Sequence, residues 1–190
     1  MPDWNAFYAE REIDESAQPV QVLLQNRRLL NPQKNNSRAL DFACGFAANG
    51  RYLASLGYQT SGWDYAATAV EKLNAYSHQH QLSFQAFQHD LENAPLPDEA
   101  FDVIVVNAFL NRDLCPAISG LLKPDGLLFY QTFSGERRNE QGPSNPAYRL
   151  KPGELLTLFP ELQPVYYRED GDHAQGEDAL PDQTMLVAAR

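Results

Sequence analysis

The stretch that decides the fold is Arg38-Ala-Leu-Asp-Phe-Ala-Cys44, followed at once by Gly45-Phe-Ala-Ala-Asn-Gly50. The first segment predicts a short buried strand, and the second predicts a turn into a helix that continues through residues 51–56. Small residues at such a turn let the backbone approach a ligand without a Cβ in the way. Together they predict the first strand, turn and helix of an α/β domain, with a ligand site at the turn.

Strands and helices alternate on both sides of this stretch. The run Phe101-Asp-Val-Ile-Val-Val-Asn107 is typical of a strand buried on both faces, as in a parallel sheet. Further strands are predicted at 59–64, 83–89, 127–133, 162–168 and 184–189, and further helices at 18–30, 67–78, 114–122 and 152–159. The last two strands follow each other without a helix, so we expect an antiparallel pair. The pattern predicts a doubly wound, mostly parallel α/β sheet with helices on both faces.

Two of the segments between these elements are a short turn and an unusually long loop. Residues 123–126, Lys-Pro-Asp-Gly, predict a turn before the strand at 127–133. Residues 134–150 form a polar loop of about 17 residues, and loops of that length are usually either functional or disordered.

Composition restricts the partners. The 190 residues contain 25 acidic and 15 basic side chains, a formal net charge of −10. Non-specific nucleic-acid binding needs a basic face, so we expect no nucleic-acid partner. No apolar run reaches the length of a membrane helix, and the start shows no signal peptide. With two cysteines and no metal-ligand spacing among the four histidines, we expect a cytoplasmic single domain without a metal.

Three carboxylates lie in, at the end of or just after predicted strands. Asp41 lies inside the first strand, Asp64 ends the second and Asp90 follows the third. An acid at the end of the second strand can bind both hydroxyls of a ribose, which indicates a nucleoside-containing cofactor. Gly45-x-Ala47-x-x-Gly50 is also a weak variant of the dinucleotide fingerprint. A carboxylate at Asp41, which suits a cationic amino group, favours a cofactor other than NAD.

These residues resemble a known family. Asp41-x-Ala-Cys-Gly45 with Asn49, then Gly62-Trp-Asp64 and His89-Asp90-Leu91, are similar to the class I S-adenosylmethionine-dependent methyltransferases. Residues 121–128, Leu-Leu-Lys-Pro-Asp-Gly-Leu-Leu, resemble the segment before that family's fifth strand. Residues 145–154 resemble the small bacterial tellurite-resistance-related branch.

The resemblance implies a Rossmann-like seven-stranded sheet of order 3-2-1-4-5-7-6 with one antiparallel strand. It implies S-adenosylmethionine as cofactor, S-adenosylhomocysteine as product, and direct in-line transfer of a methyl group to a small molecule, with thiols and chalcogen oxyanions as suggested acceptors. The cofactor-binding residues that it implies are Asp41, Ala43, Gly45, Asn49, Asp64, Tyr65, Asp90, Leu91 and Asn107. The family usually has glycine where this chain has Ala47, so a positive φ at that position would strain the turn.

The acceptor side is less defined. Candidates for the acceptor pocket are Tyr8, Asn111 and Arg112, and no catalytic base is evident. Residues 1–37 are expected to form a helical lid or extension on a methyltransferase domain at 38–190. Trp4, Phe7 and Tyr8 are expected either to cap the site or to pack on the domain surface. A non-catalytic nucleotide-binding module of the same fold and an NAD-dependent enzyme are the alternatives.

Overall fold

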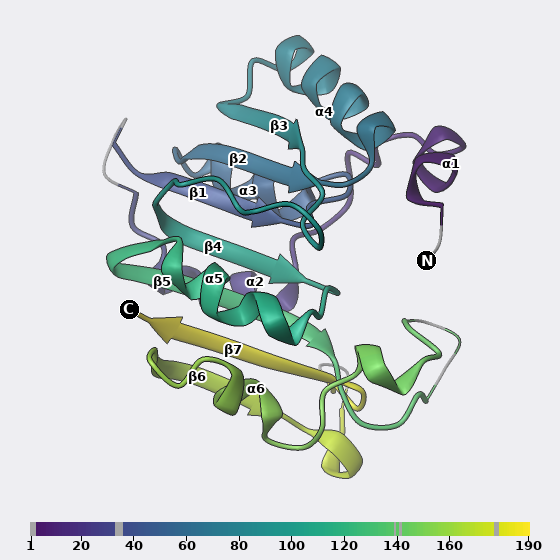
Figure 1. Cartoon of the computed structure of the whole chain (residues 1–190), viewed down its shortest axis with the longest axis vertical. Helices are drawn as coiled ribbons and strands as arrows, with labels where there is room; N and C mark the ends of the chain where they lie inside the picture. Colours follow the sequence, from purple (N-terminus) through teal and green to yellow (C-terminus); the bar gives the residue numbers. More distant parts are fainter. Residues whose placement is uncertain (1–2, 33–35, 139, 141, 177–178) are drawn as a thin grey trace.

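One twisted sheet organises the chain. The computed structural model describes residues 3–32, 36–138, 140, 142–176 and 179–190 (Figure 1). Its strands are β1 (Arg38–Phe42), β2 (Gln59–Asp64), β3 (Phe84–Gln88), β4 (Phe101–Asn107), β5 (Leu122–Phe133), β6 (Gln163–Glu169) and β7 (Gln183–Ala189). The order is β3-β2-β1-β4-β5-β7-β6, and β7 runs antiparallel to both of its neighbours. The predicted doubly wound topology is confirmed.

The predicted turn at residues 123–126 lies within a strand instead. β5 begins at Leu122, which pairs with Phe101, and the register then shifts so that Leu127 pairs with Val103. Asp125, with φ of 63°, takes up the extra length. Its N–H donates to the Arg190 carbonyl, and the Arg190 N–H donates back to Gly126. Pairing with the C-terminus therefore keeps the irregular segment in the sheet.

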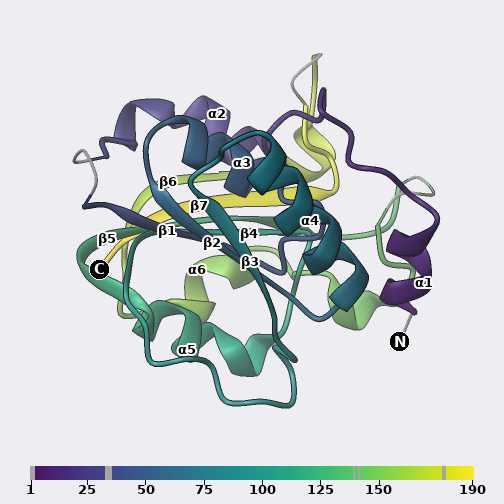
Figure 2. The same cartoon turned by 90° about the horizontal axis from the view of Figure 1, so that it is seen from above.

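Helices cover both faces of the sheet. They are α1 (Trp4–Ala9), α2 (Gln21–Gln25), α3 (Ala48–Ser55), α4 (Ala67–Gln79), α5 (Cys115–Gly120) and α6 (Glu154–Leu158), with 3-10 turns η1 (Arg27–Leu29), η2 (Arg112–Leu114), η3 (Pro146–Tyr148) and η4 (Gly171–His173). Figure 2 shows α2, α3 and α4 on one face, and α5 and α6 on the other. This is the layering expected of a doubly wound sheet.

The helix predicted at residues 18–30 is shorter than expected. Val20, which precedes α2, is extended, and its N–H donates to the Asn49 side chain. At the other end the Asn26 amide donates to the Val22 carbonyl, and the chain tightens into η1. Side-chain hydrogen bonds at both ends thus replace the longer helix.

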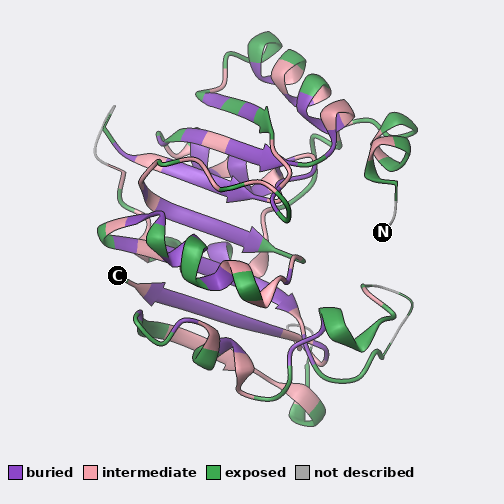
Figure 3. Cartoon of the chain, in the orientation of Figure 1, coloured by how far each residue is buried: buried purple, intermediate pink, exposed green. Residues whose placement is uncertain are grey.

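The central strands form the buried core. β4 and β7 are almost wholly buried, whereas α1 is largely exposed (Figure 3). On the α2 face, Val22 and Leu23 pack with Val105, Phe129 and neighbouring apolar side chains. Residues of α2 therefore belong to the body of the domain, and within the described N-terminal segment it is α1 that lies outside the core. No described helix is long and apolar enough to cross a membrane.

Candidate functional site

The turn after β1 has an unusual backbone. Ala43, Gly45 and Ala47 have φ of 55°, 52° and 51°, so every second residue is left-handed. The Ala47 N–H donates to the Cys44 carbonyl at 2.7 Å, and the Ala47 carbonyl accepts from the N–H of Arg51 in α3 at 2.8 Å. This compact turn lies at the carboxyl edge of the sheet, where doubly wound folds bind ligands.

Asp64 closes the turn from the neighbouring strand. Its Oδ2 accepts from the Gly45 N–H at 2.7 Å, and its Oδ1 accepts from the Ala66 N–H at 2.9 Å. Desolvation by burial raises the pKa of this carboxyl, although the backbone hydrogen bonds oppose the shift. The sequence prediction that Asp64 and Gly45 share one site therefore agrees with their direct hydrogen bond.

Asp41 lies deeper, between β1 and α3. Its Oδ2 accepts from the Gly50 N–H at 2.8 Å, and its side chain is buried. A Cβ on Gly50 would lie 2.5 Å from a ring carbon of Phe84. Glycine at this position therefore allows α3 to pack closely against the Phe84 ring of β3. Burial raises the pKa of Asp41 to about 8, against the opposing hydrogen bonds from Gly50 and the Asn49 side chain. Asn49 therefore supports Asp41 and also holds Val20.

Neither Asp41 nor Asp64 is in an ion pair with another described residue. A buried carboxylate is costly without a cation or full hydrogen bonding. Two such groups beside one glycine turn are therefore suited to a ligand that carries positive charge and hydroxyl groups. Among the residues placed by the structure, no group of three or more His, Cys, Asp or Glu side chains could hold a metal ion.

The other predicted cofactor residues lie at the ends of neighbouring strands. Tyr65 follows Asp64 and is exposed, and Asn107 ends β4 with an exposed side chain. Asp90 accepts from Asn93 and from the Glu92 N–H, contacts that lower its pKa. Leu91 beside it is buried. These residues frame the edge on which the β1 turn lies.

The acceptor candidates lie on different elements. Asn111 is the N-cap of η2, and its side chain accepts from the Asp113 N–H. Tyr8 in α1 lies instead against the β1 turn, where its ring centroid is 4.8 Å from that of Phe46. The sequence carried a signal for α1 that the prediction did not use: Asp3, the N-cap, whose carboxylate accepts from the Ala6 N–H.

The Arg112 guanidinium is fully engaged. Its Nε and Nη2 donate to the two Glu154 oxygens at 2.7 and 3.0 Å, and Nη1 and Nη2 donate to the Ala147 and Arg149 carbonyls at 2.7 and 3.0 Å. This pairing raises the pKa of Arg112 and lowers that of Glu154. Arg112 therefore fastens the end of the 134–150 loop to η2 and does not present a free cation.

Replacing Arg112 by lysine should loosen that loop. Lysine keeps the charge but lacks the planar fork that serves four acceptors. We expect trypsin to cleave the variant at Arg137 and Arg138 at least several-fold faster than wild type, measured by mass spectrometry of timed digests. Arg28→Lys, at an exposed position, is the control. Equal cleavage rates in Arg112→Lys and wild type would show that these contacts do not hold the loop.

The left-handed conformation of Ala47 gives a second prediction. The left-handed region costs an L-residue about 1–2 kcal/mol, which glycine avoids, although glycine gains freedom in the unfolded chain. Ala47→Gly is therefore expected to raise the Tm by about 1–4 °C in a thermal melt. Ala48→Gly, one residue later in α3, should instead lower it. A lower Tm for Ala47→Gly would mean that the turn is not strained.

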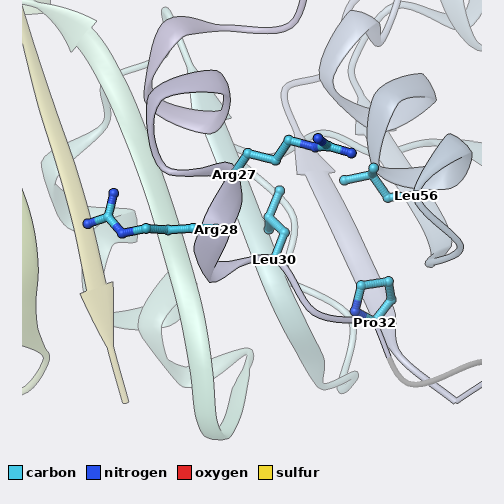
Figure 4. Close-up of a pocket in the computed structure, with 5 residues that line it drawn as sticks. All are labelled: Arg27, Arg28, Leu30, Pro32 and Leu56. Carbon is cyan, nitrogen blue, oxygen red and sulfur yellow. The ribbon is translucent and has the colours of Figure 1, made fainter.

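A shallow pocket elsewhere is separate from this site. It is lined by Arg27, Arg28, Leu30, Pro32 and Leu56, near the amino end of β1 (Figure 4). Figure 4 shows Arg27 directed toward Leu56 and Arg28 directed away from it, so the two cations do not converge. The pocket lies at the edge of the sheet opposite the β1 turn.

The strand order and the carboxylate-lined turn define a Rossmann-like domain of the class that binds ligands at the carboxyl edge. In sequence, residues 39–126 match a methyltransferase domain family. A probable S-adenosyl-L-methionine-dependent methyltransferase, TehB of Haemophilus influenzae, is 34% identical over 84 residues, which are 43% of this chain and 29% of that protein. The sequence match thus spans less than a third of the relative's length.

Solved structures agree with the fold. TehB from Haemophilus influenzae superposes with a TM-score of 0.73 at 18% identity, over 98% of this chain and 67% of that one. A protein from echinomycin biosynthesis, studied in the conversion of a disulfide bond into a thioacetal group, gives 0.72 at 16% identity over 98% and 90%. Geranyl diphosphate C-methyltransferase from Streptomyces coelicolor, solved with S-adenosyl-L-homocysteine, gives 0.70 at 13% over 99% and 97%. The chain is thus similar to S-adenosylmethionine-dependent methyltransferases in sequence and in fold.

Proposed function

We propose that the protein is an S-adenosylmethionine-dependent methyltransferase that acts on a small molecule. The observation that carries the proposal is the pair of buried carboxylates, Asp41 and Asp64, beside the Gly45 turn with no ion-pair partner among the described side chains. S-adenosylmethionine supplies the groups that they lack, an ammonium, a sulfonium and two ribose hydroxyls. The matching methyltransferase domain at 39–126 supports the same assignment.

Each residue near the carboxyl end of a strand is assigned a role according to the part of the cofactor that it would contact. Asp64 would accept from the ribose hydroxyls, because its two oxygens retain acceptor capacity beyond the Gly45 and Ala66 hydrogen bonds. Asp41 would hold the ammonium side, with Asn49 as its support. Ala43 and Gly45 would line the methionine part. Tyr65, Asp90 and Leu91 would hold the adenine, and Asn107 would face the transferred methyl group.

The chemistry asks little of the protein beyond alignment. S-adenosylmethionine, when bound, supplies an activated methyl group for in-line displacement. Holding the acceptor in line and excluding water can account for about 7–11 kcal/mol of barrier reduction in favourable cases. A base is required only where the acceptor must lose a proton, and a thiolate or a chalcogen oxyanion needs none. Because the cofactor supplies the activated methyl group and the protein supplies alignment, the site does not require a base, and we assign none.

The acceptor pocket is proposed to lie between α1 and the 134–150 loop, both of which lie beside the carboxyl edge in Figure 1. Of residues 1–37, α1 would supply the lid, whereas α2 would belong with the catalytic domain at 38–190, against which it packs. Asn111 would line the pocket, and Arg112 would fix the shape of its wall through η3. Thiols are the acceptors that this arrangement suits best, since Arg112 is neutralised by Glu154.

The test is methyl transfer itself. S-adenosylmethionine labelled in its methyl group is incubated with the protein and a panel of thiols, selenite and tellurite, and both the labelled methylated acceptor and S-adenosylhomocysteine are quantified by mass spectrometry. We expect product formation to depend on both the protein and a thiol. Cofactor binding without transfer to any acceptor in a broad panel would favour the non-catalytic module.

A further inference from the structure

Tyr8 occupies the face of Gly45 that the turn leaves free. A Cβ on Gly45 would lie 2.4 Å from the Tyr8 hydroxyl oxygen and 3.2 Å from Cζ. The ring also packs against Phe46 and stacks with Trp4 at 6.2 Å. The missing Cβ of a turn glycine is what allows a ligand to approach the backbone. The phenol therefore lies where the ligand of this turn would lie.

The electrostatic surroundings of Tyr8 reflect its position beside the two carboxylates. Burial raises the pKa of Tyr8, and the charges of Asp64, Cys44 and Asp41 raise it further. Two of these groups are the carboxylates proposed to bind the cofactor. The phenol therefore stays protonated beside the two carboxylates, and its position rests on the contacts with Gly45 and Phe46.

The rest of α1 is weakly anchored. The helix has six residues; none of them is fully buried, and Asn5 and Tyr8 are half-buried. The Thr68 N–H and hydroxyl donate to the Asn5 side chain at 3.3 and 3.4 Å, and the Lys72 ammonium donates to the Ala9 and Arg11 carbonyls. The linker at 14–18 is exposed. A helix this short is marginal by itself, so α1 can leave the turn at small cost.

We propose that α1 is an autoinhibitory gate in which Tyr8 competes with the cofactor for the Gly45 face. The proposal rests on the proposed function, since it takes S-adenosylmethionine as the ligand of the turn. The cofactor binds the open state, and its apparent affinity is reduced by the fraction of molecules in which Tyr8 is closed. After binding, α1 closes over the ligand from outside or remains displaced.

The gate predicts the opposite result from a simple lid. If Tyr8 merely contacted the cofactor, Tyr8→Ala would weaken binding. If Tyr8 competes, Tyr8→Ala should raise the association rate and lower the Kd for S-adenosylhomocysteine by about fivefold or more, because the closed state is emptied. Since no residue of α1 is fully buried, the variant is expected to fold, and thermal melts verify this. Phe87→Ala, an exposed aromatic on edge strand β3, is the control and should bind like wild type.

Trp4 provides an independent signal. It is 37% exposed on α1, whereas Trp63 is 1% exposed in the core, so acrylamide quenching reports on Trp4. We expect its quenching to change when wild-type protein is saturated with S-adenosylhomocysteine. Weaker or equal binding by Tyr8→Ala, or unchanged quenching at saturation, would overturn the gate while leaving the cofactor assignment in place. If neither wild type nor variant bound S-adenosylmethionine or S-adenosylhomocysteine, the proposed function would fail and the gate with it.

Discussion

Replacing Asp64 by alanine is expected to weaken S-adenosylmethionine binding by about tenfold or more, the loss of one charge-assisted hydrogen bond. The reason is the position of the carboxylate, which holds the Gly45 and Ala66 N–H groups and is proposed to accept from the ribose. Isothermal titration calorimetry of wild type and variant measures the change.

Two further variants sharpen this result. Asp64→Asn keeps one oxygen for the turn but removes the charge, so it should lose affinity without losing the fold. Asp98→Ala removes an exposed acid elsewhere and should bind like wild type. Wild-type affinity in both Asp64 variants would refute the ribose role.

Replacing Asp41 by asparagine is expected to stabilise the ligand-free protein and to weaken cofactor binding. The pKa of Asp41 is raised from 3.8 to about 8 by burial. Between these two values the folded protein holds a proton that the unfolded chain releases, so the free energy of unfolding falls as the pH rises from about 4 to 8. The amide side chain of the Asp41→Asn variant does not titrate, and it still offers an oxygen to the Gly50 N–H.

Measurements at different pH values therefore separate the effect of Asp41→Asn on stability from its effect on cofactor binding. At pH 8.5 the Tm of Asp41→Asn should exceed that of wild type by about 4 °C or more, and the difference should shrink toward pH 5. Wild-type affinity for S-adenosylmethionine should strengthen as the pH rises toward 8, because the ammonium needs the ionised carboxylate. Affinity of the variant should lack this dependence. A variant that is less stable at pH 8.5 would contradict the assignment of a buried, proton-holding carboxyl.

Local sequence was enough for most of the fold. The bounds of β2 and β4 agree with the predicted 59–64 and 101–107, and for β4 the reason is its local run of β-branched residues, which favours a strand. The antiparallel β6–β7 pair was also predictable, because the sequence predicts no helix between the last two strands. The irregular start of β5 was not, since it depends on pairing of Asp125 and Gly126 with Arg190 at the far end of the chain.

The residues of the site can likewise be divided into those that the sequence could predict and those that it could not. Asp41, Gly45 and Asp64 could be placed together because strand ends meet at one edge of a parallel sheet. The partner of Arg112 could not be predicted, because Glu154 is 42 residues away and reaches it through packing of α6. Tyr8 on Gly45 is likewise a tertiary contact, and it is the one that suggests how the site is controlled.

The most direct test of the account is a calorimetric titration of the wild-type protein with S-adenosylmethionine, S-adenosylhomocysteine and NADH in parallel. The carboxylate pair at Asp41 and Asp64 predicts saturable one-to-one binding of both sulfur nucleosides and none of NADH. Tight binding of NADH, with no heat from either sulfur nucleoside, would contradict it.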